Sequence, residues 1–449
     1  MSVKSMVVMS AAALVVVAPL VVTSPSIGAS PLASASRDGR DSVAATWELP
    51  VALADYTRGS AFTVDAHSDT TVVWEAVTGE VMSVRRAADG TWTPSEVIGQ
   101  SHAAFGSPQV AADADGNLTA VWITQQEGVT DGVMAATWTA VSGWSDPVSI
   151  SQDRSVATYP SDGIGPWGAA HLSMAVSPKG AAVVAWDWGS EERNKPWRIQ
   201  SVYHRPGHGW SHAGDVTRAR GYRSPQVGIS ADGTVVLLYA RQPMAHPQAL
   251  FSQRRHPGKG WTSATTVAGK GYGEQLAVDR AGDAVVVFTP NWSSVMATYR
   301  PSGNRWRTAR RLSPAGVRVN DHFSLAMNGR GKALVAMGRT HGRVDLVQRR
   351  PHTAWTTPVP VVTSSDSSQL VEVALNGSND TFLGWGEYAL LGQYRPDGGS
   401  WSSGFTVSPD PGADVLDSIS AQVAPNGDVI VLWAQEDHPL YVRVMTTQQ

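Results

Sequence analysis

The sequence predicts an all-β protein built from one repeated unit of four short strands. The first observation is a recurring phrase, a turn with Asp or Asn and Gly followed by an apolar run that ends in a large side chain, as in DGNLTAVW at 115–122 and GDVIVLW at 427–433. The second is a Gly-rich turn followed by a Trp and a short strand, which alternates with the first phrase along the chain. The third is that the two ends of the repeated region complement each other.

The spacing of the first phrase gives the size of the unit. Its terminal residues lie mostly 48 to 53 positions apart, and they are Trp74, Trp122, Trp186, Tyr239, Phe288, Met337, Trp385 and Trp433. Alternating apolar residues and many β-branched side chains favour strands, and D-G and N-G pairs suit tight hairpin turns. Four-stranded units of about 50 residues are typical of β-propeller blades. We therefore expect a β-propeller of eight four-stranded blades, with seven as the alternative count and a solenoid as the alternative architecture.

The repeat begins and ends in different phases. ATWELPVALA at 45–54 reads as a fourth strand with no blade before it, and the last repeat stops at YVRVMTTQQ, its third strand, at 441–449. We expect the N-terminal strand to complete the last blade, which would leave no open sheet edge at the junction. The Trp residues of both phrases are expected to fill the gaps between neighbouring blades.

The first residues have the pattern of an export signal. Lys4 precedes an apolar run at 6–22, and small residues then offer cleavage after Ala29 or after Ala35. An uncleaved membrane anchor is the alternative, but the run is short for a span. The expected organisation is a signal peptide at 1–35, a disordered segment at 36–44 and a single propeller domain at 45–449. The protein is expected to be secreted, either extracellular or associated with the cell surface.

Composition excludes several classes of function. The net charge of −3 and the pI near 6.5 give no case for binding nucleic acid or an anionic membrane. The absence of cysteine removes disulfides, thiolate metal sites and a cysteine nucleophile. No dinucleotide, phosphate-binding or zinc-protease motif occurs, so no cofactor and no metal are expected. We expect a monomer without a membrane span after signal removal, whose partner is a glycan or a cell-surface protein.

The candidate ligand site lies on the rim that carries the long connections. Two of them belong to the same predicted blade. One leads into its first strand, SQDRSVATYPSDGIGPWGAAHL at 151–172, and the other joins its second and third strands within WDWGSEERNKPW at 186–197. Loops that carry aromatic side chains on a rigid scaffold are common binding sites. The candidate ligand-binding residues are Trp167, His171, Asp187, Trp188, Glu191, Glu192, Arg193, Trp197 and Trp292, and no catalytic residue is assigned. The competing interpretation is that these loops only pack on each other.

The repeats resemble secreted bacterial β-propeller proteins and, more loosely, propeller lectins and sialidases. The S-x-D-x-G-x-x-W repeat of sialidases is absent, so no residue role is carried over from them. We expect a secreted, non-catalytic protein that recognises carbohydrate through the loop-rich face, because aromatic side chains suit the apolar side of a sugar ring and neighbouring acids and amides suit its hydroxyls. A protein-interaction platform is the alternative function, and a glycoside hydrolase or lyase, which would need two converging carboxyl groups, is a further one.

Overall fold

The computed structural model describes the chain from residue 45 onward, with short gaps. The described residues are 45–101, 108–126, 129–151, 171–190, 195–217, 221–241, 248–291, 293–315, 319–339, 342–363, 370–408, 416–435 and 439–447. The chain divides into two compact units, Met1–Ser42 and Val43–Gln449. The predicted signal peptide and the segment after it, 1–44, lie outside the described residues.

Every element in the described part of the chain is a β-strand. The first three sheets along the chain contain β3 (Thr57–Val64), β4 (Thr70–Ala76), β5 (Glu80–Arg86) and β6 (Glu96–Gln100); β7 (Gln109–Ala112), β8 (Leu118–Gln126), β9 (Val129–Thr139), β10 (Gly143–Trp144) and β11 (Val148–Ser149); and β12 (Leu172–Val176), β13 (Ala182–Ser190), β14 (Lys195–Arg205), β15 (Gly209–Trp210) and β16 (Gly214–Asp215). The next sheet contains β17 (Tyr222–Ile229), β18 (Val235–Arg241), β19 (Gln248–Arg255), β20 (Thr265–Val278), β21 (Ala284–Thr289), β22 (Met296–Arg300) and β23 (Arg310–Arg311). The remaining sheets contain β24 (Val319–Met327), β25 (Ala333–Arg339), β26 (Arg343–Arg349) and β27 (Val359–Val362); β28 (Leu370–Leu375), β29 (Thr381–Gly386), β30 (Leu390–Arg395) and β31 (Phe405–Thr406); and β32 (Leu416–Val423), β33 (Val429–Gln435), β34 (Leu440–Thr447), β1 (Ala45–Trp47) and β2 (Val51–Ala54).

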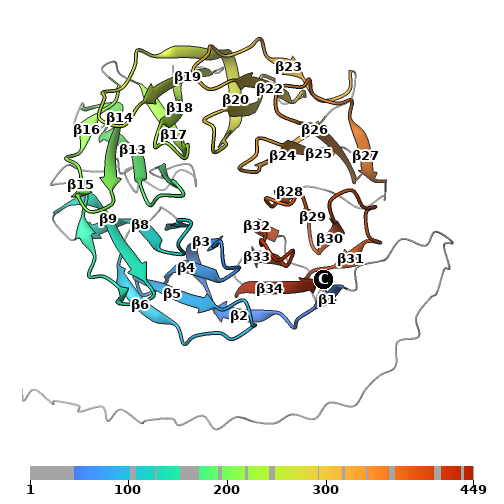
Figure 1. The fold of residues 1–449 in the computed structure, drawn as a ribbon, viewed down its shortest axis with the longest axis horizontal. Helices are drawn as coiled ribbons and strands as arrows, with labels where there is room; N and C mark the ends of the chain where they lie inside the picture. The colour runs from blue at the N-terminus through green and yellow to red at the C-terminus, as the bar shows by residue number, and fades with distance from the viewer. Residues whose placement is uncertain are drawn as a thin grey trace, which may run out of the picture. The chain divides into compact units, whose positions relative to one another are not determined.

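Each sheet is antiparallel, and its strands pair in chain order except in the last sheet, where β1 and β2 pair with β34. In the sheet from β17 to β23, the long strand β20 pairs with β19 through its first half and with β21 through its second half. Figure 1 shows the sheets standing side by side around a centre, with one strand of each nearest the centre. This arrangement confirms the predicted all-β fold and is that of a β-propeller.

Polar side chains link the innermost strand of one sheet to the innermost strand of the next. Gln109 of β7, for example, accepts a hydrogen bond from the Met174 amide of β12 at 2.7 Å and donates to the Leu172 carbonyl. Gln422 of β32 makes the same double contact with the Val64 amide and the Phe62 carbonyl of β3. The side chains that accept such an amide proton, from the neighbouring sheet or, for Gln226, from β20 of the same sheet, are Gln109, Ser173, Gln226, Gln275, Ser324, Glu372 and Gln422.

The N-terminal strands lie beside the C-terminal strand. Ala45 to Trp47 of β1 pair with Thr447 to Met445 of β34, and β2 pairs with the first residues of the same strand. Glu48, between β1 and β2, forms an ion pair with the buried Arg86 of β5. The sheet formed by β32, β33 and β34 thus receives its outer strands from the start of the described chain (Figure 1).

The recurrent Asp and Asn residues of the turns act locally. Asp113 Oδ1 accepts hydrogen bonds from the Asp115 and Asn117 amides, both at 2.9 Å, and Asp279 holds the same kind of turn through the Ala281 and Asp283 amides. Such side chains satisfy backbone donors that a tight turn leaves unpaired. The described residues contain no group of acids or histidines arranged to hold a metal ion.

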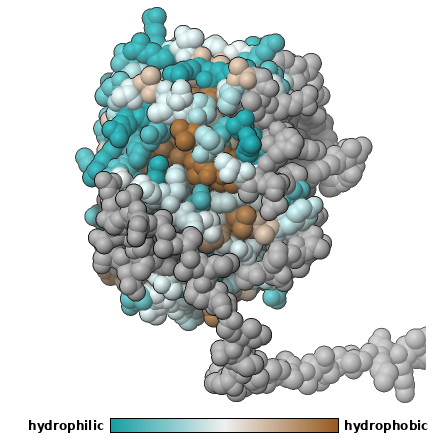
Figure 2. Space-filling model, turned by 90° about the vertical axis from the view of Figure 1, so that its right-hand side faces the viewer, coloured by the Kyte–Doolittle hydropathy of each residue, from teal (hydrophilic) through white to brown (hydrophobic). Residues whose placement is uncertain are grey.

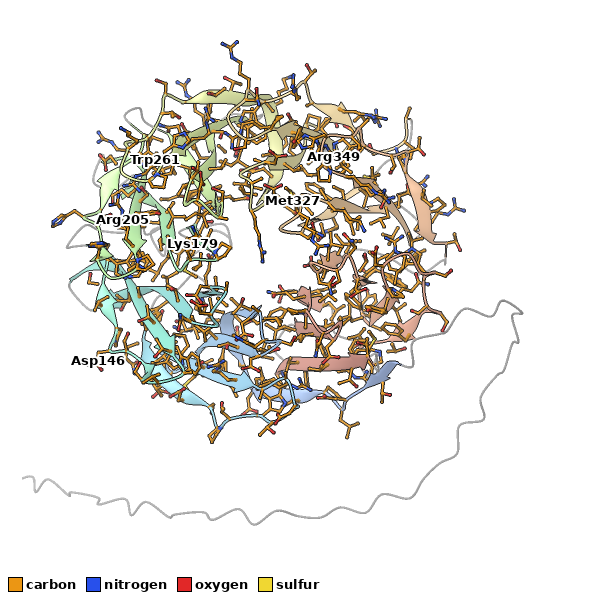
Figure 3. The ribbon with its side chains drawn as sticks, viewed as in Figure 1. Asp146, Lys179, Arg205, Trp261, Met327 and Arg349 are labelled. Carbon is orange, nitrogen blue, oxygen red and sulfur yellow. The ribbon has the colours of Figure 1, made fainter. Side chains whose placement is uncertain are left out.

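The core lies between neighbouring sheets. The Trp residues of the apolar phrase are buried, and Trp186 is 0% exposed within a cluster that also contains Val184 and Ile123 of the preceding sheet. Most Trp residues of the second phrase are only half-buried and pack on the rims of these clusters, as Trp261 does, whereas Trp355 is buried. The prediction of Trp packing between sheets is therefore confirmed for the first phrase and holds in part for the second. Figure 3 shows side chains filling the space between the sheets.

The outer surface of the unit is mixed in character. Figure 2 views it from the side, and there apolar side chains gather in one patch surrounded by hydrophilic ones. Across the part of the chain that the structure describes, no helix has the length and apolar character needed to cross a membrane.

Candidate functional site

Two of the predicted site residues form a hydrogen-bonded pair. His171 directly precedes β12, and Asp187 lies on the neighbouring strand β13. His171 Nδ1 lies 2.9 Å from Asp187 Oδ2. The Asp187 side chain is 1% exposed, whereas that of His171 is 42% exposed, so the imidazole reaches the surface while the carboxylate orients it from below. The Ser224 amide donates a weaker hydrogen bond to the same carboxylate oxygen at 3.3 Å.

Burial and charge act in opposite directions on this pair. Burial lowers the pKa of His171, but the Asp187 hydrogen bond and charge, together with the charge of Glu274, outweigh burial and leave the pKa above its ordinary value. Burial raises the pKa of Asp187, and the contacts with His171 and Ser224 offset only part of the rise. Burial likewise raises the pKa of Glu274 on β20. The Asp187 and Glu274 charges therefore favour the protonated imidazole.

Of the other predicted site residues, the structure describes the strand positions of Trp188 and Trp197 only. Trp188 and Trp197 were expected in a connection, and this expectation is wrong, because β13 extends to Ser190 and β14 begins at Lys195. The two Trp residues thus belong to the strands of one hairpin, in which Trp188 pairs with Arg198. The pairing of β13 with β14 extends beyond the apolar run that ends at Trp186, and the apolar pattern of the sequence does not show this extension. Trp167, Glu191, Glu192, Arg193 and Trp292 lie outside the described residues.

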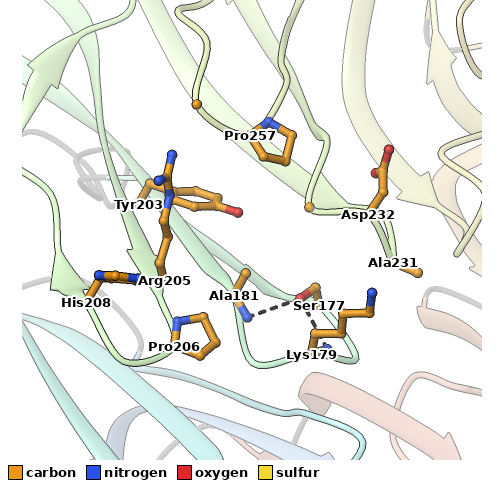
Figure 4. A pocket seen from close by; sticks show the side chains of 12 residues that line it. Ser177, Lys179, Ala181, Tyr203, Arg205, Pro206, His208, Ala231, Asp232 and Pro257 are labelled. Atoms are coloured by element: carbon orange, nitrogen blue, oxygen red, sulfur yellow. Dashed lines mark hydrogen bonds between the residues drawn. The ribbon is translucent and has the colours of Figure 1, made fainter.

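A pocket that sequence reasoning missed lies at the opposite rim. In an antiparallel meander, the first and third turns lie at one end of the sheet and the second turn at the other end. The pocket occupies about 510 Å³ between the sheet of β12–β16 and the strands β17–β20. Its walls come from four short turns near 177–181, 205–208, 231–233 and 257–258, with Tyr203 between them. Figure 4 shows these side chains arranged around the opening.

Tyr203 forms the inner wall of the pocket. This residue is buried on β14, and the Arg255 guanidinium of the next strands lies over its ring, 4.7 Å from the centroid. The Arg205 guanidinium lies 5.9 Å from the same centroid. The hydroxyl faces Gly233, whose φ is +82° and where a Cβ atom would lie 2.9 Å from that hydroxyl. A side chain at position 233 would therefore clash with the Tyr203 hydroxyl and with Pro257.

The pocket contains cations and a carboxylate, and only the carboxylate is hydrogen-bonded by its own turn. Lys179 and Arg205 are exposed at its edge, and among the described residues no carboxylate lies within ion-pair distance of either. Asp232 is held by its own turn, because its Oδ1 accepts from the Thr234 amide at 2.9 Å and its Oδ2 from the Thr234 hydroxyl at 3.1 Å. A hydrogen bond from the Ser230 hydroxyl lowers the pKa of Asp232.

A smaller cavity of about 170 Å³ adjoins Tyr203 toward the outside of the ring. Ser201, Asp215, Arg255 and Trp261 line it, and the Trp261 indole donates a hydrogen bond to the Ser201 hydroxyl at 3.2 Å. The labels of Arg205, Lys179 and Trp261 in Figure 3 fall on the same part of the ring. The junction of these two neighbouring sheets therefore combines an aromatic ring, several cations and hydrogen-bonding groups.

Little in the sequence distinguishes this junction from the others. Arg205-Pro206 has a counterpart in Arg350-Pro351, and the Asp-Gly turn at 232–233 belongs to the general repeat. Tyr203 does not distinguish it either, because Tyr299 and Tyr394 hold the same strand position in two other units, each accepting a backbone hydrogen bond from the residue eight positions later. The turns around the pocket look alike in every unit, whereas the long connections differ between units.

Comparisons with known proteins give structural likenesses only. No protein family model and no curated protein matches the sequence. The chain is similar to the BP39L lectin from Burkholderia pseudomallei, with 13% identity and a TM-score of 0.56 over 79% of this chain and 100% of that chain. It is also similar to a prolyl endopeptidase, with 12% identity and a TM-score of 0.50, over 84% of this chain and 54% of that chain.

A looser likeness is to the fucose-recognising lectin of Aleuria aurantia, described as a six-bladed β-propeller. The identity is 13% and the TM-score 0.41, over 79% of this chain and 97% of that chain. Likenesses at such low identity concern the fold, since one fold hosts many unrelated functions.

Proposed function

We propose that this chain is a secreted, non-catalytic, carbohydrate-binding β-propeller of eight blades, a single domain from residue 45 onward. The observation that carries the binding function is the pocket between β12–β16 and β17–β20, where the Tyr203 ring and hydrogen-bonding groups converge in about 510 Å³. Sites for small ligands are concave, of about 300–1,000 Å³, with aromatic walls and a few polar groups. Sugars suit such a place because an aromatic ring packs against their apolar faces while polar groups bind their hydroxyls.

The count of eight rests on the strand pairing. When β20 is divided between its two partners, every group consists of an inner strand, two middle strands and a short outer portion. We infer that β1 and β2 serve as the outer portion of the last blade, since they pair with β34. The contact of Gln422 with β3 supports a ring in which the last blade lies against the first.

The loop-rich rim is proposed as a second place for ligand contact. His171 is partly exposed there and is oriented by Asp187, so its free ring nitrogen suits a sugar hydroxyl. The predicted neighbours Trp167, Trp188, Glu191, Glu192, Arg193, Trp197 and Trp292 complete this proposal.

Glycan binding by the purified protein tests the function. The protein, together with the Trp188→Ala, Trp197→Ala and Tyr203→Phe variants, is applied to a panel of glycans and cell-wall polysaccharides. The proposal expects saturable binding, weakened by the variant whose residue contacts the sugar. Unchanged circular dichroism and melting temperature of the variants serve as the folding control.

The outcomes separate the alternatives. Hydrolysis or elimination of a bound glycan would refute a non-catalytic role and indicate a glycosidase or lyase. A panel without any binding would refute carbohydrate recognition and favour a protein-interaction platform.

A further inference from the structure

The pocket at Tyr203 is lined by two cations, Lys179 and Arg205, and by one carboxylate, Asp232. Lys179 and Arg205 reach its edge from two turns of the same sheet, and in the described part of the chain neither has an ion-pair partner. Asp232, the carboxylate of the lining, has both oxygens occupied by Thr234 and Ser230. The cations are therefore available to a ligand, whereas the carboxylate is engaged by its own turn.

Arg255 adds a second, deeper cation beside the same ring. Its Nη1 is buried and has no hydrogen-bond partner among the described residues, and its guanidinium lies over the Tyr203 ring. A cation on an aromatic face is stabilised by the ring electrons. Burial raises the pKa of Tyr203, so its hydroxyl stays protonated and able to donate at neutral pH.

Apart from Lys179, Arg205, His208 and Asp232, the residues that line the pocket are uncharged. Pro206 and Pro257 lie on different sides of the pocket (Figure 4), and Gly233 lies so close to the Tyr203 hydroxyl and to Pro257 that it has no room for a side chain. A ligand therefore meets an anion-binding edge on one side and apolar ring atoms with one hydroxyl donor on the other.

We propose that this pocket binds an acidic saccharide, a sugar ring that carries a carboxylate or a sulfate. Arg205 and Lys179 contact the anionic group, because a guanidinium presents paired donors to two oxygens and an ammonium adds a point charge. The Tyr203 hydroxyl donates to a ring oxygen or hydroxyl, and Pro206 and Pro257 pack against the ring. This inference rests on the proposed carbohydrate-binding function and names the chemical class of the ligand.

The test compares three polysaccharides that differ in charge. Polygalacturonate carries carboxylates, dextran sulfate carries sulfates and dextran is neutral. The wild-type protein is expected to bind one or both acidic polymers more tightly than dextran, and the arm with the higher affinity identifies the anionic group. The net charge of −3 opposes unspecific attraction of polyanions.

Matched variants locate the binding. Arg205→Gln is expected to weaken binding of the acidic polymer by at least about tenfold, the loss of one charged hydrogen bond. Arg350→Gln, at the same turn position of another unit and also exposed, is the control and is expected to leave binding unchanged. Arg205→Lys keeps the charge and is expected to retain part of the affinity.

Failure of the acidic-saccharide site can be distinguished from failure of carbohydrate binding. Equal affinity for dextran and the acidic polymers, or equal effects of Arg205→Gln and Arg350→Gln, would overturn the acidic-saccharide site while carbohydrate binding stands. Absence of binding to these three and to every other glycan would overturn both. Preserved melting temperatures in all variants tie the losses to the pocket rather than to folding.

Discussion

A glutamate in the polar links between sheets offers a sharp test of the packing. Glu372 of β28 lies four residues before Asn376, the position that Gln226 holds before Ser230 in an earlier unit. It accepts a hydrogen bond from the Ser324 hydroxyl at 2.9 Å and one from the Ala421 amide. Burial outweighs both contacts and raises the pKa of Glu372 from 4.5 to about 7.

The sign and size of the effect follow from linkage. Because the folded pKa is raised, the folded state holds the proton after the unfolded state has released it. The free energy of unfolding therefore falls as pH rises from about 4.5 to about 7 and is constant above that range. At about 1.4 kcal/mol per pH unit, the loss amounts to about 3 kcal/mol at pH 8. Glu372→Gln keeps the shape and the acceptor oxygen without a charge, so it should remove this loss.

Urea denaturation of wild type and Glu372→Gln at several pH values measures the difference. The variant is expected to match wild type near pH 4 and to be more stable by about 3 kcal/mol at pH 8. Gln226→Glu is the reciprocal control and is expected to introduce a loss of stability with rising pH. Parallel pH profiles of Glu372→Gln and wild type, or a variant less stable at pH 8, would refute the reasoning.

Three further predictions concern closure, the core and the histidine pair. Deleting residues 45–54 should lower the melting temperature strongly, because β34 loses β1 and β2 and keeps only β33 as a partner, and an unchanged melting temperature would disprove closure by β1 and β2. In denaturant unfolding, Trp186→Ala should cost about 3–5 kcal/mol and the half-buried Trp261→Ala only about 2 kcal/mol, so equal costs would contradict the burial described above. The raised pKa of His171 stabilises the fold fully below about pH 6.5 and ceases to do so as pH rises through the folded value. The difference in free energy of unfolding between wild type and His171→Gln should therefore become smaller as pH rises. A difference that grows with pH in unfolding titrations would contradict the Asp187 contact.

The repeated part of the fold could be predicted from the sequence because each unit obeys short-range rules. Asp113 and Asp279 accept hydrogen bonds from the amides of their own turns. Apolar runs such as the one that ends at Trp186 are buried between neighbouring sheets. The polar links through Gln226 and Glu372 were not predicted, since a lone polar residue in an inner strand has no short-range signature. Strand pairing across hundreds of residues, as between β1 and β34, was expected only from the phase of the repeat.

The site was harder to predict than the fold. His171 and Asp187 were expected to share a surface, and the structure brings them into hydrogen-bond contact. The pocket at Tyr203 was missed because its walls are turns that look structural in every unit. Its properties arise from the junction of two sheets, where Arg205 and Arg255 reach one ring from different strands.

Calorimetric titration of the intact protein tests whether it binds carbohydrate, as we propose. The oligosaccharide that binds best in the glycan panel is titrated into wild-type protein and into the Arg205→Gln and Trp188→Ala variants. We expect saturable heat with wild type and a weaker curve in at least one variant that is still folded. Absence of saturable heat with every oligosaccharide tried, from a protein that melts cooperatively, would contradict the proposal.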